Sequence, residues 1–482
     1  MNIPDDAFFA LLTRGIQQRG DATLQRALYQ ALREAILQGE LLSHSRLPGA
    51  RVIAQRAGVS RNTVNSALEQ LAIEGYLIRS RQGTYVAALN TLAESEPAPP
   101  AFVLPERLRT LPLPGRRDSP ALLLTTGMPA VNYFPLAIWR RLLDRVLRED
   151  GSTILGYGEA AGEPALREAI ARHLTLSRGI RCTARQIVIT EGALEGVNLC
   201  THLLSVAGDT AWVEEPGYFG AKSVFIKAGL QLKGIPVDGD GMCPDSVNEV
   251  APRLIFTSPS HQYPSGAVMS AGRRLALLEY ARQHDAWIVE DDYDSEFRYS
   301  GEPIQAMLGM IPPVVYLGTF SKTLFPSLRI GFAVMPSALA EAAQGAIGAL
   351  LRGGHRLEQR ALALFIEEGH YARHLASMRR LYRRRQQQLR EAVASEFTLA
   401  NEIWGGEGGL HLTVAVDDID DVQIVEQARQ YQMAPAALSR FYLNPHKARS
   451  GLVLGYGNTS AAHFVPALRT LNRLIRQQRG SG

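Results

Sequence analysis

The sequence feature that most constrains the fold is an alternation of short apolar runs with longer amphipathic stretches, which begins near Ala121. The apolar runs, each typical of a buried strand, are Ile187–Thr190, Ala211–Val213, Leu254–Thr257, Ala286–Val289 and Val314–Leu317. Strands that alternate with helices predict an α/β domain with a mainly parallel sheet. Ligands bind such open sheets at the carboxyl ends of the strands, so the loops after these runs are where a binding site is expected.

The segment after the last of these runs carries a lysine in an unusual setting. GTFSKTLFPSLRIGF, which starts at Gly318, places Lys322 among small hydroxyl residues and Arg329 shortly after it. The chain has only five lysines, although lysine and arginine together number 51. A lysine at a strand end is a candidate for an imine with an aldehyde cofactor, which an arginine cannot form. The alternative is an ordinary exposed loop lysine.

The loops after the other strands carry further candidate residues. The turn after Thr190 leads into a helix expected to begin near Glu195, whose backbone amides can hold a phosphate. Tyr218 lies on a turn, where its ring can cover a flat cofactor or simply pack in the loop. Asp291 can pair with a protonated pyridine nitrogen, and nearby Tyr293 can bond a ring hydroxyl. Acidic residues at strand ends also bind metals or face water, so none of these residues is decisive alone.

Three amphipathic helices and a hairpin are predicted before residue 90. The helices begin near Leu24, Ala50 and Arg61, and Ser60 is a good N-cap for the third. The hairpin tip, Arg79–Gly83, is basic. This order predicts a winged helix-turn-helix, in which polar residues in the first turn of the third helix can contact phosphates and base edges. The net charge of the chain is only +4, so a nucleic-acid surface must be local.

Length and composition predict that the chain has more than one domain. Its 482 residues exceed one ordinary domain, and 46% hydrophobic residues are typical of a soluble globular protein. Residues 91–120 are rich in proline and lack periodicity, so they are predicted to link a domain at 12–90 to a domain at 121–482. The three cysteines form no CxxC motif, the sequence does not open with a basic and then apolar segment, and no apolar run is long enough to span a bilayer. A cytoplasmic location without a membrane partner is therefore expected.

Two sets of motifs resemble known families. RLPGARVIAQRAGVSRNTVNSALEQLAIEGYLIRSRQGTYVA is similar to the DNA-binding domain of the GntR superfamily. SPSHQYPSG, VEDDYDSEFRY and GTFSKTLFPSLRIGF resemble fold type I aminotransferases, specifically the bodies of MocR/GabR-type transcriptional regulators. The resemblance covers essentially the whole chain. It implies an α/β protein in which an N-terminal winged helix-turn-helix is joined by a linker to an aminotransferase-like domain that binds pyridoxal 5′-phosphate.

The resemblance also implies a cofactor site. Pyridoxal 5′-phosphate would be bound to Lys322 as a Schiff base, with Asp291 on the pyridine nitrogen and Tyr293 on the ring hydroxyl. Tyr218 would stack on the ring. Tyr263 stands where aminotransferases commonly have the asparagine of NPTG, and it is a further candidate for contact with the cofactor.

The resemblance places other residues at the phosphate end of the cofactor. Thr319, Arg329 and the backbone amides of Ala193 and Leu194 would hold the phosphate. Tyr157 resembles the tyrosine that reaches the phosphate from the neighbouring subunit, which implies a homodimer with shared sites. The phosphate loop departs from the family because it contains an acidic Glu191 and has no hydroxyl at position 193, which is expected to lower cofactor affinity.

The effector end departs from the family as well. Aminotransferases clamp the substrate carboxylate with a late arginine just inside the last strand, where this chain has Val453. Arg440 is the nearest substitute and is the candidate effector-binding residue. Without the usual clamp, the effector is an amino compound that need not be a simple α-amino acid.

DNA contacts are implied by the same resemblance. They lie on the second and third helices and on the wing, at Arg51, Arg61, Asn62, Thr63, Asn65, Gln82 and Gly83. The family usually has a serine before the arginine of the second helix, where this chain has Ala50, so one phosphate contact is expected to be missing. The expected partner is double-stranded DNA with paired half-sites, bound by a dimer.

Two further patterns are less specific. His370 and His374 lie four residues apart in a predicted helix, but no third ligand is apparent and no metal is expected. The segment from Arg373 to Arg390 carries seven arginines and no acid. This segment is either a solvated helix face or a second phosphate-contacting surface, with the former favoured.

Three functional hypotheses follow. The first is a transcriptional regulator whose aminotransferase-like domain senses pyridoxal phosphate, an amino-compound effector or both. The second is a working aminotransferase whose DNA-binding head localises it. The third is a DNA-binding module on a scaffold that binds no cofactor. Turnover with a keto-acid acceptor separates the first two, and cofactor binding separates both from the third.

Overall fold

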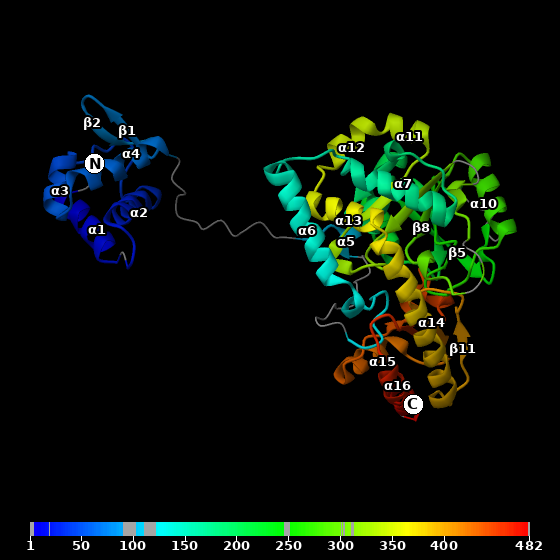
Figure 1. The fold of residues 1–482 in the computed structure, drawn as a ribbon. Coiled ribbons are helices and arrows are strands. Elements are labelled where there is room, and N and C mark those ends of the chain that lie inside the picture. Colours follow the sequence, from blue (N-terminus) through cyan, green and yellow to red (C-terminus); the bar gives the residue numbers. More distant parts are fainter. Residues whose placement is uncertain are drawn as a thin grey trace. The chain divides into compact units, whose positions relative to one another are not determined.

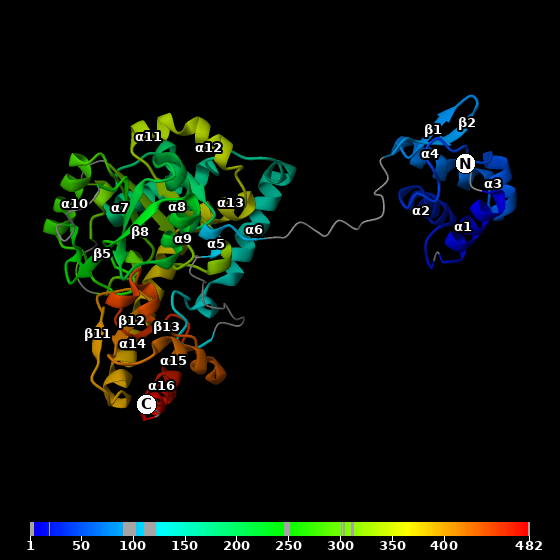
Figure 2. The same ribbon diagram turned by 180° about the vertical axis from the view of Figure 1, so that it is seen from behind.

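The computed structural model describes residues 4–18, 20–89, 103–109, 122–244, 251–299, 301, 304–309 and 313–480. The chain divides into two compact units, Met1–Leu104 and Pro105–Gly482, which we call the head and the body. Figures 1 and 2 show both units from opposite sides. Of the predicted linker at 91–120, only 103–109 is described, and it includes one short helix, α5 (Glu106–Arg109). No helix in the described part of the chain is long and apolar enough to cross a membrane.

The head contains four helices and a two-stranded hairpin. The elements are α1 (Asp5–Gln17), α2 (Leu24–Leu37), α3 (Ala50–Ala57), α4 (Arg61–Ile73), β1 (Leu77–Ser80) and β2 (Gly83–Val86). Gly58 ends α3 in the left-handed conformation, and the Ser60 hydroxyl caps α4 by accepting a hydrogen bond from the amide of Thr63. Leu28, Leu32 and Leu68 lie in the shared core. The three predicted helices and the predicted hairpin are thus present, and α1 is an addition that the sequence interpretation did not include.

The body is built on an eight-stranded sheet with the order β3-β10-β9-β8-β7-β4-β5-β6. The strands are β3 (Ile187–Thr190), β4 (Thr210–Glu215), β5 (Gln231–Asp238), β6 (Gly241–Met242), β7 (Leu254–Thr257), β8 (Trp287–Asp292), β9 (Val314–Thr319) and β10 (Gly331–Val334). The pairs among β5, β4, β7, β8 and β9 are all parallel, whereas β10 runs antiparallel to β9 and β3. The predicted mainly parallel sheet is therefore confirmed.

Helices cover both faces of this sheet. They are α6 (Leu136–Asp150), α7 (Pro164–Arg178), α8 (Ala193–Leu204), α9 (Phe219–Ala228), α10 (Ala271–Gln283), α11 (Ser337–Ala342), α12 (Gln344–Leu350) and α13 (Arg356–Glu367). In β3, the side chains of Ile187 and Ile189 join one core cluster, whereas Val188 between them joins another. Because the strand is buried on both faces, its sequence is continuously apolar rather than alternating.

A smaller subdomain follows the long helix α14 (His370–Glu396), which Figure 1 shows leading from the region of the large sheet towards the C-terminus. Its antiparallel sheet has the order β11-β12-β14-β13, with β11 (Glu402–Trp404), β12 (His411–Ala415), β13 (Ala436–Ala437) and β14 (Gly451–Gly455). The helices α15 (Asp421–Ala428) and α16 (Phe464–Gly480) complete it. The body therefore combines a large α/β part with a small antiparallel part.

Candidate cofactor site and nucleic-acid interface

The candidate site lies at the carboxyl ends of β8 and β9, which are parallel neighbours. Asp291 pairs with Leu317 and Asp292 with Gly318, so the acidic end of β8 lies beside the segment that leads to Lys322. Because both strands end at the same edge of the sheet, residues far apart in sequence meet there. This is the edge that the sequence pattern indicated.

Lys322 is held by a loop from the start of the body. Its Nζ donates a hydrogen bond of 2.8 Å to the carbonyl oxygen of Gly127. Gly127 has a φ of +66°, and a Cβ at this position would lie 2.6 Å from the Lys322 Nζ. Only glycine combines this backbone conformation with such a close approach. The amino group is thus fixed in place by a neighbouring carbonyl and is half-buried.

Asp291 is a buried carboxyl group whose side chain lacks a complete set of partners. It is only 5% exposed, and its Oδ1 accepts no hydrogen bond from the described residues. Burial, together with the neighbouring charges of Asp292 and Glu214, raises the pKa of this carboxyl to about 8, and the charge of Lys322 opposes that rise. An ionised carboxylate at this position therefore needs a cationic partner that the described residues do not supply. A protonated pyridine nitrogen meets that need.

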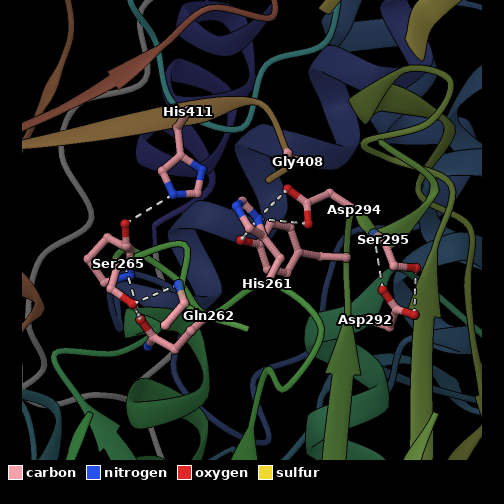
Figure 3. Close-up of polar contacts among 12 residues, drawn as sticks. His261, Gln262, Ser265, Asp292, Asp294, Ser295, Gly408 and His411 are labelled. Carbon is pink, nitrogen blue, oxygen red and sulfur yellow. Dashed lines mark hydrogen bonds and ion pairs between the residues drawn. The ribbon is translucent and has the colours of Figure 1, made fainter. Parts of the chain in front are cut away.

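The next residue, Asp292, differs from Asp291 because its carboxylate has several partners within the protein. Its Oδ2 lies 2.8 Å from the guanidinium of buried Arg178 and accepts a 2.6 Å hydrogen bond from the hydroxyl of Tyr316. Ser295 donates two further hydrogen bonds to the same carboxylate, as Figure 3 shows. Of the two adjacent aspartates, Asp292 is thus fully partnered within the protein, whereas Oδ1 of Asp291 has no partner among the described residues.

Tyr293, the predicted partner of the ring hydroxyl, contacts a group that the sequence interpretation missed. Its hydroxyl oxygen lies 3.0 Å from Nδ1 of His261, which is also 3.1 and 3.0 Å from the two carboxylate oxygens of Asp294. Figure 3 shows the His261 ring facing the Asp294 carboxylate, with His411 nearby. His261 and His411 are almost fully buried, and their ring centroids are 5.2 Å apart.

Tyr263 lies at the centre of an aromatic cluster. Its ring makes edge-to-face contacts with Tyr218, Tyr293, His411 and Phe441, at centroid distances of 6.4, 6.0, 4.9 and 5.1 Å. Burial raises the pKa of its hydroxyl to about 12, so this group stays protonated. The structure therefore brings the predicted residues Tyr218, Tyr263 and Tyr293 together on one side of the site.

The predicted phosphate-binding residues gather at the start of α8. This helix begins at Ala193, two residues earlier than expected, because Gly192 with a φ of +82° turns the chain directly from β3 into the helix. Arg329, whose φ of +52° is left-handed, donates a 2.7 Å hydrogen bond to the carbonyl oxygen of Glu191. Its guanidinium would lie 3.3 Å from a Cβ at Gly192. A helix N-terminus beside an arginine is a favourable anion site.

The remaining predicted cofactor residues differ in position. Thr319 is buried at the end of β9, and its hydroxyl accepts a hydrogen bond from the amide of Ser321. Leu194 is 37% exposed in the first turn of α8. Tyr157, which follows the short 3-10 helix at Gly151–Leu155, is 97% exposed. A side chain this exposed is available for contact with a second copy of the chain.

The predicted effector residue lies on an exposed turn. Arg440 is exposed in the 3-10 helix Leu438–Phe441, and the adjacent Phe441 packs on Tyr263. Val453, which stands at the position of the usual carboxylate clamp, is fully buried in β14 and packs with Leu438 and Phe441. This wall of the site is therefore apolar.

The predicted DNA-contacting residues lie on α3, α4 and the β1–β2 hairpin. Arg51, Arg61, Asn62 and Gln82 are exposed, whereas Thr63, Asn65 and Gly83 are half-buried. The Thr63 hydroxyl lies 2.8 Å from that of Ser60, so it already takes part in the cap of α4. At the start of α3, where the family usually has a serine, no side chain caps the helix.

Other groups of interest lie elsewhere in the body. His370 contacts Glu368 and Arg373, whereas His374 is buried and contacts the carbonyl oxygen of Thr323, so the two rings have separate partners. Of the seven arginines from Arg373 to Arg390, Arg385 is buried and Arg390 is half-buried, and the other five are exposed. A hollow of about 880 Å³ between the end of α7 and the start of α11 is lined by none of the predicted site residues.

Comparisons with known proteins match both units. Residues 24–86 match the family described as bacterial regulatory proteins, gntR family, and residues 123–434 match aminotransferase class I and II. The structure resembles a multiple substrate aminotransferase from Thermococcus profundus, with a TM-score of 0.71 and 25% identity, over 79% of this chain and 98% of that one. It also resembles a kynurenine aminotransferase from Pyrococcus horikoshii, with a TM-score of 0.68 and 27% identity, over 75% of this chain and 92% of that one. The protein is thus a GntR-type DNA-binding domain fused to a fold type I aminotransferase-like domain.

Relatives that share both parts define the family more closely. The chain is 37% identical to the probable rhizopine catabolism regulatory protein MocR of Rhizobium meliloti, over 97% of each chain. It is 31% identical to the HTH-type transcriptional regulator TauR of Rhodobacter capsulatus, over 99% of this chain and all of that one. A pyridoxine biosynthesis transcriptional regulator, PdxR of Corynebacterium glutamicum, is 30% identical over 89% of this chain and 91% of that one. The chain belongs to the MocR-type family of transcriptional regulators, as its motifs predicted.

Proposed function

We propose that the protein is a transcriptional regulator whose head binds operator DNA and whose body binds pyridoxal 5′-phosphate at Lys322 and senses that cofactor, an amino-compound effector or both. The observation that carries the proposal is the Asp291 carboxyl, which is buried, has an Oδ1 without a partner among the described residues and lies beside the strand that leads to Lys322. A carboxylate in this state is costly unless a cation pairs with it. The protonated ring nitrogen of the cofactor is that cation.

The neighbouring residues fit the rest of the cofactor. Tyr293 lies two residues beyond Asp291 and bonds the ring hydroxyl, and Tyr218 covers the ring. At the other end of the site, Arg329, Thr319 and the amides of Ala193 and Leu194 hold the phosphate. These roles are supported by the convergence of the side chains on one edge of the sheet.

The bound cofactor supplies an aldehyde that condenses with primary amines and a ring that withdraws electrons. Lys322 provides the amine of the protein, and the Gly127 carbonyl oxygen, 2.8 Å from its Nζ, orients it. With an amino effector bound in place of the lysine, the Gly127 carbonyl oxygen would be the acceptor for the free Lys322 amino group. Exchange between these two states changes the contacts of the loop at Gly127, which gives the body two arrangements between which a ligand can select.

The proposal of a dimer rests on Tyr157. Its side chain is 97% exposed, although it resembles a phosphate-contacting residue. A second copy of the chain would receive this tyrosine in its cofactor site, and two heads would then read two half-sites. Replacement of Tyr157 is therefore expected to lower the affinity of the dimer for the cofactor, although the residues that each subunit contributes to its own cofactor site are unchanged.

The effector is an amino compound for which the apolar wall at Val453 is suitable. This wall offers no cation to a carboxylate, so Arg440 is the candidate for any acidic end of the ligand. Relatives include regulators named for rhizopine catabolism and for pyridoxine biosynthesis. Amines and the cofactor itself are the first compounds to test.

The experiment that tests the proposal measures binding of the full chain to its own promoter region, with and without pyridoxal phosphate and with a panel of amines. A change in affinity caused by either ligand supports a sensor. The rival function is a working aminotransferase, and sustained turnover with a keto-acid acceptor at about 1 per second or faster would favour it. Promoter binding that is indifferent to both ligands, with no cofactor bound, would leave only a scaffold.

A further inference from the structure

Three oxygen atoms surround one nitrogen of a buried histidine behind the candidate cofactor site. Nδ1 of His261 lies 3.1 Å from Oδ1 and 3.0 Å from Oδ2 of Asp294, and 3.0 Å from the hydroxyl oxygen of Tyr293. His261 is 5% exposed and Asp294 is 1% exposed. Figure 3 shows the contact between the imidazole and the carboxylate. These three residues come from the loops after β7 and β8.

The positions of the hydrogen atoms follow from what each group can donate. Burial raises the pKa of the Asp294 carboxyl, whereas the contact with His261 lowers it. In its ionised form this carboxylate only accepts hydrogen bonds, so its contact with His261 then requires a proton on Nδ1. The Tyr293 oxygen, at the same distance from this N–H, then can only accept from it. The phenolic hydrogen of Tyr293 therefore points away from His261. This hydrogen would be available to the ring-hydroxyl oxygen of a cofactor held at Lys322.

The surroundings of the other ring nitrogen of His261, Nε2, support a proton on Nδ1. Nε2 has no hydrogen-bond partner among the described residues, and it lies 3.3 Å from where a Cβ on Gly266 would stand. A proton on Nε2 alone would leave a buried donor unsatisfied and would also remove the donor that Asp294 needs. The tautomer with Nδ1–H satisfies the carboxylate and leaves only a lone pair without a partner.

The neighbouring groups hold the pair in place. His411, on β12, donates from Nε2 to the Pro264 carbonyl oxygen at 3.1 Å, and burial lowers its pKa to about 3, so it stays neutral. Gly409, with a φ of +83°, closes over the pair, and a Cβ there would lie 2.1 Å from Cε1 of His261. The charged groups that act on Asp294 from other elements are Lys322 and Asp292.

We propose that Asp294 and His261 form a positioning pair that fixes the Tyr293 hydroxyl as a hydrogen-bond donor to the ring-hydroxyl oxygen of bound pyridoxal phosphate. The inference rests on the proposed function, because it gives Asp294 and His261 a role that exists only when the cofactor is bound. In this chain the asparagine that commonly precedes the proline of NPTG is replaced by Tyr263. His261 lies in the same loop as Tyr263. This loop can therefore still influence the ring oxygen, through the contact between His261 and Tyr293.

A metal ion is the competing explanation for this cluster. Ligand atoms of His261, Asp294 and His411 all lie within 4.8 Å of one another. However, the Nε2 of His411 is already bonded to a carbonyl oxygen, and the Asp294–His261 distances are those of hydrogen bonds. The hydrogen-bonded pair is thus favoured, and the experiment below separates the two.

The test replaces Asp294 by asparagine in the full chain. Asparagine donates to Nδ1 and moves the imidazole proton to Nε2, as the same change does in a serine protease triad. Nδ1 then accepts from Tyr293, and the ring oxygen of the cofactor loses its donor. The pH midpoint of the visible spectrum of the lysine-bound cofactor should rise by about half to one pH unit, the effect of one hydrogen bond.

A second variant and a control make the result specific. In a Tyr293→Phe background, the Asp294→Asn change should add no further rise, because the hydroxyl through which it acts is gone. His173→Gln, at a half-buried histidine on α7, should leave the midpoint unchanged. A fall in the midpoint of Asp294→Asn, which loss of a nearby negative charge alone would produce, would overturn the proposal.

A measurement without cofactor keeps the inference independent of the proposed function. Nitrogen NMR of histidine-labelled protein free of pyridoxal phosphate should show His261 with its proton on Nδ1, assigned by loss of the signal in His261→Gln. Finding the neutral tautomer with the proton on Nε2 would overturn the inference even if the cofactor binds. A change in these chemical shifts on treatment with a chelator would mean that the cluster holds a metal ion, and it would overturn the proposed pair. Failure to bind the cofactor, with the Nδ1 proton in place, would overturn only the proposed function.

Discussion

Replacement of Asp291 by asparagine should stabilise the protein that lacks cofactor and should weaken cofactor binding. The carboxyl is buried, and its Oδ1 has no partner among the described residues. Asparagine has nearly the same shape but carries no ionisable proton. The substitution therefore removes the cost of a buried acid, and it also removes the anion that pairs with the ring nitrogen of pyridoxal phosphate. A change that stabilises the protein but weakens ligand binding is the expected signature of a functional residue.

The size of the effect depends on pH. Burial raises the pKa of Asp291 from 3.8 to about 8. Between these values the unfolded chain has lost the proton that the folded chain still holds, so stability falls as pH rises, by about 1.4 kcal/mol per pH unit. The upper limit of the loss is about 6 kcal/mol when pH passes the folded value. The asparagine variant lacks this loss, so its advantage grows from near zero at about pH 4 to its full value at about pH 8.

Urea unfolding of the full chain without cofactor measures this advantage. The midpoint of Asp291→Asn should exceed that of the wild type by an amount that increases steadily from about pH 5 to about pH 8. The matched control is Asp144→Asn, at an exposed aspartate on α6, for which the difference should stay constant. A constant difference for Asp291→Asn over the same range would refute the argument from the buried carboxyl. Added pyridoxal phosphate should stabilise the wild type more than the variant.

Three further changes test other parts of the account. Arg61→Ala should weaken binding to the promoter region about tenfold in a titration and leave cofactor spectra unaltered, and equal affinity would count against α4 as the recognition helix. Gly127→Ala places a Cβ 2.6 Å from the Lys322 Nζ and should reduce the amount of cofactor bound, whereas Gly272→Ala, where a Cβ meets no atom within 4 Å, should not. Tyr157→Ala should raise the dissociation constant for pyridoxal phosphate, and an unchanged constant would argue against sites shared between subunits.

The strands could be predicted from the sequence because most of them are buried on both faces. β3 and β7 begin and end at the predicted residues, since their apolar runs stop where the loops begin. In the head, α3 ends at Ala57 because Gly58 adopts the left-handed conformation that ends a helix, and a glycine at such a position is visible in the sequence. Local patterns of this kind act within a few residues, so the sequence alone contains them.

Two local features were missed or shifted although signals were present. α1 buries Phe8, Phe9 and Leu12 against the rest of the head, and the spacing of Phe8 and Leu12 is a helical signal that was overlooked. The start of α8 was expected near Glu195 and lies at Ala193. The positive φ of Gly192 lets the helix begin immediately after the strand, which the apolar pattern could not indicate.

The pair behind Tyr293 could not be predicted, because its members meet only through the fold. His261 follows β7 and Asp294 follows β8, and no spacing in the sequence relates them. The different states of Asp291 and Asp292 were hidden for the same reason. Arg178, at the end of α7, and Tyr316, in β9, satisfy Asp292 from distant parts of the chain. Long-range contacts therefore decide which of the two acids has its hydrogen-bond partners within the protein.

The central claim, that the body binds pyridoxal phosphate through Lys322, is tested most directly by the visible absorption spectrum of the purified protein with added cofactor. The wild type should show the band of a lysine-bound pyridoxal, and Lys322→Ala should show only the spectrum of the free or loosely bound aldehyde. The Lys322 Nζ is held by a 2.8 Å hydrogen bond to the carbonyl oxygen of Gly127. Identical spectra for the two proteins, both those of free cofactor, would contradict the claim and leave the body as a scaffold.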